Sequence, residues 1–138
     1  MLDVHYPEIA RLIGVPQPEK YHPEGDVFTH SMLVLDAMAK QTTSLERRFA
    51  ALVHDLGKWD SVQKWSLYPE DHPYETHRGH EELGIPHVQT LCERLKLPKT
   101  WLKAGVFGAE FLPKMQKRQY KIFTWHILPE LKKITVQQ

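Results

Sequence analysis

One segment of the sequence combines side chains that bind divalent metals with a side chain that binds phosphate. His54 and Asp55 stand side by side at the end of an apolar run, and Lys58 follows His54 by four residues. Divalent ions are held by neutral imidazole nitrogens and carboxylate oxygens that converge from rigid elements. A phosphate ester at such an ion is stabilised by a nearby ammonium group. Segment 50–58 therefore predicts a metal site with Lys58 close to the substrate phosphate.

His30 offers a second ligand from another part of the chain. Leu33 and Val34 follow it by three and four residues, so His30 lies on an apolar helix face and points toward the core. Taken alone, this pattern favours a hydrogen-bonded core histidine. The next helix carries His54 and Asp55 and is expected to run antiparallel to this one. Beside that pair, the pattern favours His30 as a metal ligand.

Segment 77–84 holds three further candidates. His77 and His80 are three residues apart, so both can face one site from a single helical turn. His80 also begins an apolar stripe, which places it inward and predicts a metal ligand. We predict substrate-binding roles for His77 and Arg78, although a solvated helical turn and a surface arginine stay open as alternatives. Structural or surface roles are expected for four other histidines, His5, His72, His87 and His126.

The elements that must position these residues are helices. Asp26 is a good N-cap for a helix that runs to about Gln41. Thr43 or Ser44 caps the next helix, which reaches the His-Asp pair and stops at Gly57. Because strand patterns are nearly absent, the predicted fold is all-α, a compact bundle of about six to seven helices.

The rest of the chain is punctuated by prolines. Residues 59–78 have no steady period and predict a long loop. Pro86 interrupts the stripe that begins at His80, which favours a short turn followed by a helix from about Ile85. Further helices are expected over Pro7–Ile13, from Pro98 to about Phe111, over Lys114–Trp125 and over Leu128–Ile134.

Composition narrows the class of protein. A chain of 138 residues suits one compact domain, and a net charge of +1 gives no global field that would attract nucleic acid or a membrane. No apolar run approaches the roughly 20 residues that span a bilayer. The N-terminus lacks the pattern of a secretory signal, and Cys92 is the single cysteine, so no intrachain disulfide is possible. We therefore expect a cytoplasmic protein.

Three motifs in order resemble the HD superfamily of metal-dependent phosphohydrolases. They are His-Pro-Glu-Gly-Asp-Val-Phe-Thr-His at 22–30, Leu-Val-His-Asp-Leu-Gly-Lys at 52–58 and His-x-Gly-His-Glu-x-x-Gly at 77–84. More narrowly, they resemble the HD domain at the C-terminal end of bacterial CCA-adding enzymes (tRNA nucleotidyltransferases), which the loop at 14–18 also fits. The resemblance runs from about residue 7 to residue 111. It implies a single HD domain over 1–138, with a divergent helical part at 112–138.

The resemblance also implies the chemistry. It makes His30, His54 and Asp55 metal ligands, lines the same cleft with His77 and His80, and matches Lys58 to the lysine after the dyad. The expected cofactor is a divalent nickel, cobalt, manganese or magnesium ion. The expected substrates are nucleotide or RNA-end phosphoesters: 2′,3′-cyclic phosphates, 2′-nucleotides or small phosphomonoesters. Asp55 would orient or deprotonate the attacking water, and Lys58 would offset charge on the phosphate.

Two departures from the family leave an alternative open. No Gly-Ser loop or Asp-x-Asp pair is present, so CCA addition by this chain alone is not expected. Leu112-Pro113 stands where the family places a late His-Asp ligand, so Glu110, His126 or a water fills the position, or the site is impaired. The alternative is a non-catalytic module that binds tRNA, other RNA or a partner protein. Its basis is basic residues interleaved with aromatic ones, Lys114, Lys117, Arg118, Tyr120, Lys121, Phe123, Trp125, Lys132 and Lys133.

Overall fold

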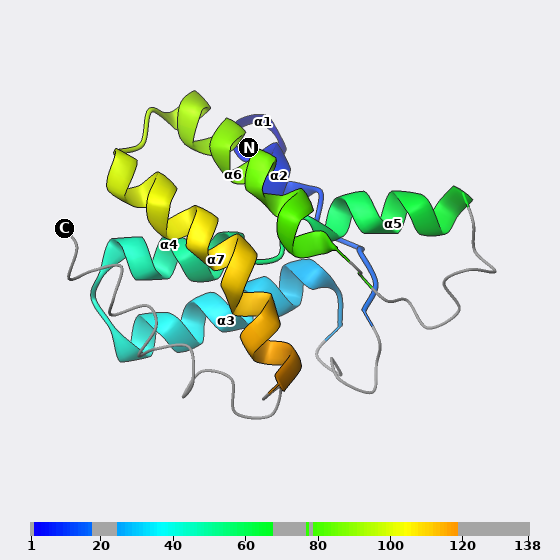
Figure 1. Cartoon of the computed structure of the whole chain (residues 1–138), viewed down its shortest axis with the longest axis horizontal. Helices are drawn as coiled ribbons and strands as arrows, with labels where there is room; N and C mark the ends of the chain where they lie inside the picture. Colours follow the sequence, from blue (N-terminus) through cyan, green and yellow to red (C-terminus); the bar gives the residue numbers. More distant parts are fainter. Residues whose placement is uncertain (1, 18–24, 68–76, 78, 119–138) are drawn as a thin grey trace.

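The computed structural model describes residues 2–17, 25–67, 77 and 79–118. Within these ranges every regular element is a helix, which confirms the all-α prediction (Figure 1). The helices are α1 (Leu2–His5), α2 (Pro7–Ala10), α3 (Val27–Gln41), α4 (Leu45–Val53), α5 (Lys58–Leu67), α6 (His80–Leu95) and α7 (Lys99–Arg118). None of them is both long and apolar enough to cross a membrane.

The two helices that carry the first two motifs begin at the predicted caps. The Asp26 carboxylate accepts a hydrogen bond of 2.7 Å from the backbone N–H of Thr29, and α3 runs on to Gln41. The Ser44 hydroxyl accepts from the backbone N–H of Arg47 at 3.3 Å and starts α4. Each cap satisfies a backbone donor that the first helical turn leaves without a partner. Short polar side chains therefore fix where both helices begin.

Helix α4 lies at the centre of the bundle. It packs between α3 and α7, and α7 also packs along α6 (Figure 1). Glycines allow α7 to approach closely, because a Cβ atom on Gly108 would lie only 2.4 Å from the carbonyl oxygen of Ala50. A Cβ on Gly105 would likewise meet Phe49 and Val88 at 2.7 Å. The end of α4 is thus surrounded by packed helices rather than by solvent.

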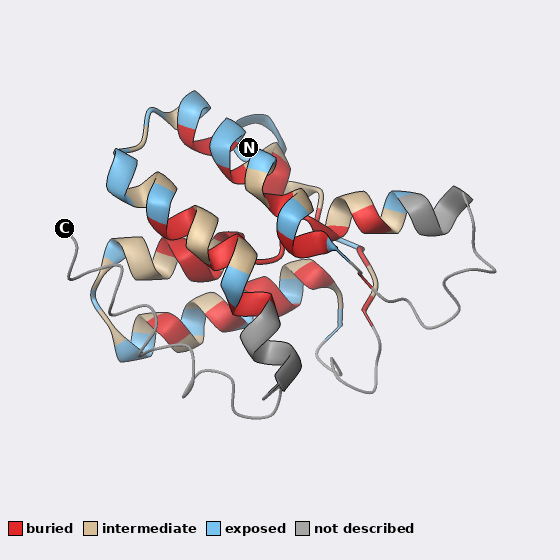
Figure 2. Ribbon diagram, viewed as in Figure 1, coloured by how far each residue is buried: buried red, intermediate tan, exposed pale blue. Residues whose placement is uncertain are grey.

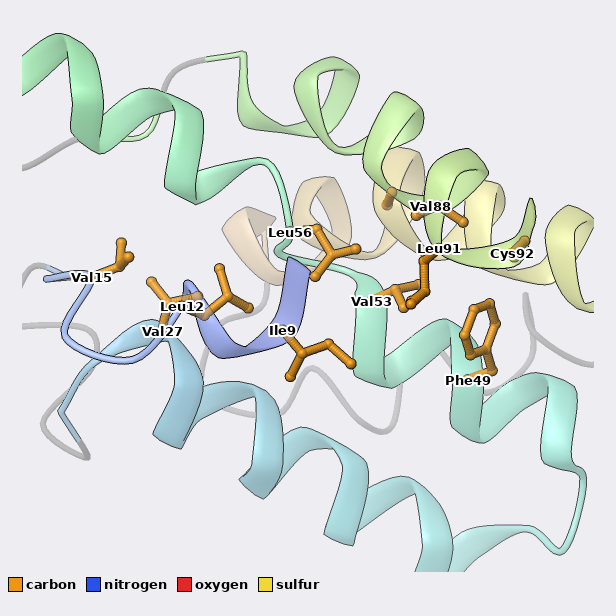
Figure 3. Packing of buried hydrophobic residues seen from close by; sticks show 11 residues of the cluster. Ile9, Leu12, Val15, Val27, Phe49, Val53, Leu56, Val88, Leu91 and Cys92 are labelled. Atoms are coloured by element: carbon orange, nitrogen blue, oxygen red, sulfur yellow. The ribbon is translucent and has the colours of Figure 1, made fainter. Parts of the chain in front are cut away.

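A continuous apolar core backs the end of α4. Buried residues concentrate where α3, α4, α6 and α7 face one another (Figure 2). The larger cluster, drawn in Figure 3, is Ile9, Leu12, Val15, Val27, Phe49, Val53, Leu56, Val88, Leu91, Cys92 and Ala109. Both Val53 and Leu56, which flank the His-Asp pair, belong to this cluster. The backbone around that pair is therefore held by side chains that have little room to move.

The predicted loop over 59–78 is wrong in its first part, because α5 continues to Leu67. Trp59 and Val62 pack against the core and Ser61 is buried, so tertiary contacts stabilise this helix. The inward residues are of mixed type, an aromatic, a hydroxyl and a β-branched side chain. They give no clear 3.6-residue apolar period, so the pattern was not visible in the sequence.

Two predicted breaks are also absent. Helix α6 is continuous from His80 to Leu95 and includes Pro86, which is exposed. Pro86 has no backbone N–H, so one carbonyl group of the preceding turn has no donor within the helix. On the exposed side of α6, water can donate to this carbonyl group, while Gly84 and Val88 pack inward. Helix α7 likewise runs through Pro113 to Arg118 instead of stopping near Phe111. The helix predicted over Leu128–Ile134 lies outside the described residues.

Candidate metal centre

The predicted ligands come together from four elements of the fold. His30 belongs to α3, His54 and Asp55 follow the last turn of α4, Lys58 begins α5 and His80 begins α6. All five side chains are buried, and Asp55 is completely inaccessible to solvent. The turn 54–57 between α4 and α5 therefore places a carboxylate in the interior with basic groups around it.

The two oxygens of the Asp55 carboxylate have different neighbours. Oδ2 lies 3.0 Å from Nε2 of His54, 3.2 Å from Nζ of Lys58 and 3.5 Å from Nε2 of His30. Oδ1 lies 3.1 Å from Nε2 of His80. One ligand atom each from His30, His54 and Asp55 falls within 4.8 Å of the others, so these three residues could hold a metal ion. His80 approaches the opposite oxygen, and its role as a ligand stays a prediction.

The tautomers of two histidines favour a cation at this point. Nδ1 of His54 donates to the carbonyl oxygen of Ala51 at 2.6 Å, and Nδ1 of His80 donates to that of His77 at 2.8 Å. A carbonyl oxygen only accepts, so Nδ1 must carry the proton in both rings. Each Nε2 that faces the Asp55 carboxylate then either carries a second proton and donates to it or, in a neutral ring, directs a lone pair toward it. Two acceptors at about 3 Å repel unless a proton or a metal ion lies between them.

Asp55 stays ionised despite its burial. Burial alone would raise the pKa of Asp55, but the neighbouring charges of His54 and Lys58, with hydrogen bonds from His54 and His80, hold it well below its usual value. A buried carboxylate that remains charged needs compensating cations close by. The donor set of two imidazoles and one carboxylate suits a divalent metal ion, so the residues fit such a cofactor.

Lys58 brings an ammonium group to the candidate metal centre. Its side chain is buried, and Nζ donates to Oε1 of Gln17 at 2.5 Å as well as facing Asp55. Gln17 did not stand out in the sequence, because it lies in a proline-rich loop with no periodic pattern. The chain just before it is nevertheless held in place, since the backbone N–H of Val27 donates to the carbonyl oxygen of Val15 at 2.9 Å.

His77 lies beside the group and has partners at both ring nitrogens. Nε2 donates to the carbonyl oxygen of Pro16 at 2.9 Å, and Nδ1 lies 2.8 Å from the hydroxyl oxygen of Ser61. Burial, together with the charge of Lys58, lowers the pKa of His77 to about 3, so the ring is neutral near pH 7. His77 thus joins the loop at residue 16 to α5, and its substrate-binding role stays a prediction. Arg78 lies outside the described residues.

A close backbone contact holds α6 against the His-Asp turn. A Cβ atom on Gly57 would lie 1.9 Å from the carbonyl oxygen of His80 and 2.6 Å from the nitrogen of Gly84. Only glycine permits this approach. Gly57, which precedes Lys58 in the second motif, therefore sets the distance between His80 and Asp55.

The late family ligand has no counterpart at the aligned position. Leu112 is fully buried and packs with Val34, Met38 and Ala50 in a second apolar cluster. Among the described residues, Glu110 does not join the three residues that converge as a metal group. His126 and most of the basic and aromatic residues of the C-terminal part lie outside the described residues.

These observations define the class of protein. The all-α bundle, with two histidines and an aspartate brought together at the end of a central helix, is consistent with the HD-domain fold that the motifs imply. No family model and no solved structure matches the chain.

The sequence relatives are more specific. The chain is 46% identical over 96 residues to the "Multifunctional CCA protein" of Methylococcus capsulatus, a match that covers 70% of this chain and 21% of the relative. It is 44% identical over 110 residues to the protein of the same name from Pseudoalteromonas atlantica, covering 80% of this chain and 25% of the relative. The chain is therefore a homologue of one segment of the multifunctional CCA proteins. It matches no more than a quarter of the length of these relatives.

Proposed function

We propose that this chain is a divalent-metal-dependent phosphohydrolase that acts on nucleotide phosphoesters. Candidate substrates are 2′,3′-cyclic phosphates, 2′-nucleotides and small phosphomonoesters. The observation that carries the proposal is the buried Asp55 carboxylate, which faces the Nε2 atoms of two imidazole rings whose Nδ1 atoms donate to backbone carbonyl groups. The kinship with CCA proteins supports a nucleotide or an RNA end as the group that carries the phosphate.

His30, His54 and Asp55 would hold the ion, with His80 fixing the second oxygen of the carboxylate. When bound, a divalent ion polarises a phosphoryl oxygen and lowers the pKa of water. The low pKa of Asp55 makes this side chain a weak proton acceptor, so its contribution is to bind the ion and to orient the attacking water. The carbonyl groups of Ala51 and His77 keep the two rings in the tautomer that can bind a cation.

Lys58 supplies the positive charge for the phosphate. It is held at 3.2 Å from Asp55 in a site from which water is largely excluded, where an ammonium stabilises developing negative charge more strongly than it would in water. Hydrolysis adds the oxygen of a water molecule to phosphorus and breaks one ester P–O bond. The leaving alkoxide takes up the proton that the water releases, and the contact with Asp55 holds Lys58 in place throughout this change.

The proposal is tested by turnover with defined ions. The purified protein is incubated with 2′,3′-cyclic AMP and with an aryl phosphate, across nickel, cobalt, manganese and magnesium and in the presence of a chelator. We expect product with at least one ion and none with the chelator. A folded protein that releases no product with any ion would contradict the proposal.

A second candidate function rests on the burial of Leu112 at the place of the late ligand. A site that lacks this ligand is compatible with a module that has kept the fold of a tRNA-processing enzyme and binds tRNA without hydrolysis. In that case no ion would support turnover, and tRNA affinity would fall steeply as salt is raised.

A further inference from the structure

Gln17 is a buried polar residue next to the candidate metal centre. Only 6% of its surface is accessible, and its Oε1 accepts the hydrogen bond from Nζ of Lys58 at 2.5 Å. The same Nζ lies 3.2 Å from Oδ2 of Asp55. One ammonium group therefore separates Gln17 from the carboxylate of the site.

The orientation of the Gln17 amide follows from its partner. An ammonium group has donors only, so the atom that faces Lys58 must be the amide oxygen. The amide nitrogen then points away from Lys58 with two N–H donors. This nitrogen is buried and makes no hydrogen bond within the described part of the chain. Burying a donor without an acceptor costs free energy, which methionine or leucine at this position would avoid.

The position of Gln17 is fixed by its surroundings. The carbonyl oxygen of Pro16 accepts from Nε2 of His77, and the carbonyl oxygen of Val15 accepts from the backbone N–H of Val27. The two residues before Gln17 are therefore tied to two other parts of the fold. A donor held in this way is oriented before a ligand arrives, which lowers the entropic cost of binding.

We propose that Gln17 is a substrate-binding residue, whose amide N–H groups donate to a phosphoryl oxygen of the ester bound beside Lys58. This inference rests on the proposed phosphohydrolase function. Non-bridging phosphate oxygens are acceptors only, so they match both the amide donors of Gln17 and the ammonium of Lys58. Gln17 adds hydrogen bonds without adding charge. The phosphoryl oxygen in turn supplies the acceptor that the Gln17 amide nitrogen lacks among the described residues.

A simpler role for Gln17 is to anchor Lys58, and substitutions separate the roles. Gln17→Glu keeps an oxygen for Lys58 but removes the N–H donors. Gln17→Met removes both the oxygen and the donors. Gln17→Glu also adds a negative charge that repels phosphate, so the roles are separated by Gln17→Met, made in the wild type and in a protein that carries Lys58→Met. If Gln17 binds phosphate, Gln17→Met weakens phosphate binding in both backgrounds; if it only anchors Lys58, Gln17→Met has no further effect beside Lys58→Met.

The experiment measures the binding of inorganic phosphate by titration calorimetry, with the ion that best supports turnover or with nickel if none does. Gln63→Glu is the matched control, because it makes the same change at an exposed position on α5. We expect Gln17→Glu to weaken phosphate binding by about tenfold or more and Gln63→Glu to change it less than twofold. For a hydrolysed ester, Gln17→Glu should raise KM more than it lowers kcat. Nickel binding should stay within a few-fold of the wild type in both variants.

The outcomes distinguish this inference from the function on which it rests. Phosphate binding that Gln17→Met weakens both with Lys58 present and beside Lys58→Met, without hydrolysis of any ester, would support the role of Gln17 and contradict the proposed function. Hydrolysis by the wild type, with unchanged phosphate affinity and KM in Gln17→Glu, would overturn the role of Gln17 alone. A wild type that binds no phosphate would also overturn it.

Discussion

Asp55→Asn is expected to abolish binding of divalent metal and to lower phosphoester hydrolysis on the order of 10²- to 10⁴-fold. The substitution keeps the size of the side chain but removes the charge that faces His30, His54 and Lys58. A neutral amide is a poor ligand for a divalent ion, and the amide hydrogens would be directed at the lone pairs or at Lys58. Nickel titration and the turnover assay measure the two effects separately.

Asp60→Asn provides the matched control for this variant. Asp60 lies on α5, five residues away, and its Oδ2 is 2.5 Å from Nε2 of His87, outside the candidate metal centre. We expect this control to bind nickel and to turn over substrate like the wild type. Full turnover by Asp55→Asn, in a folded protein, would show that the chemistry lies elsewhere.

The second large effect is the loss of stability as pH falls, and His77 is its source near pH 6. The pKa of His77 is about 3 in the folded protein, against an ordinary value of 6.5. Between these values the unfolded chain binds a proton that the folded protein does not, so stability decreases as pH falls through this window. From pH 7 to pH 5 the contribution of this side chain amounts to about 2 kcal/mol.

Urea unfolding of the metal-free protein at pH 7 and pH 5 measures this contribution. His77→Gln keeps an amide that can donate to Pro16 but does not titrate, so its loss of stability between the two pH values should be about 2 kcal/mol smaller. His5→Gln, at an exposed position on α1, should follow the wild type. Equal pH dependence in all three proteins would contradict the buried, neutral His77. The low pKa of Asp55 acts separately, because its stabilising effect is lost only below about pH 4.

Local rules explain why part of the fold was predictable. The caps at Asp26 and Ser44 are contacts over three residues, so their sequence pattern suffices to place the starts of α3 and α4. Helix α5 and the uninterrupted α6 depend instead on packing between distant segments. Trp59 and Val62 contact the core, and Pro86 is carried on the exposed side of a helix that the core holds. Neither feature has a local signal.

The candidate site was predictable in its residue types but not in its hydrogen bonds. The apolar spacing after His30 correctly placed this side chain inward, and the structure brings it to the His54-Asp55 pair. The tautomers depend on the carbonyl groups of Ala51 and His77, whose positions only the folded backbone defines. Gln17 reaches Lys58 across 41 residues of sequence, and its one signal was the loop at 14–18 that fits the family.

The most direct test of the central claim is the position of a bound ion in crystals of the wild type prepared with nickel or cobalt. We expect one anomalous scattering peak at about 2.0–2.2 Å from Nε2 of His30, Nε2 of His54 and a carboxylate oxygen of Asp55. In such crystals, a peak elsewhere, or none at these residues, would contradict the assignment of this group as the metal centre of a phosphohydrolase.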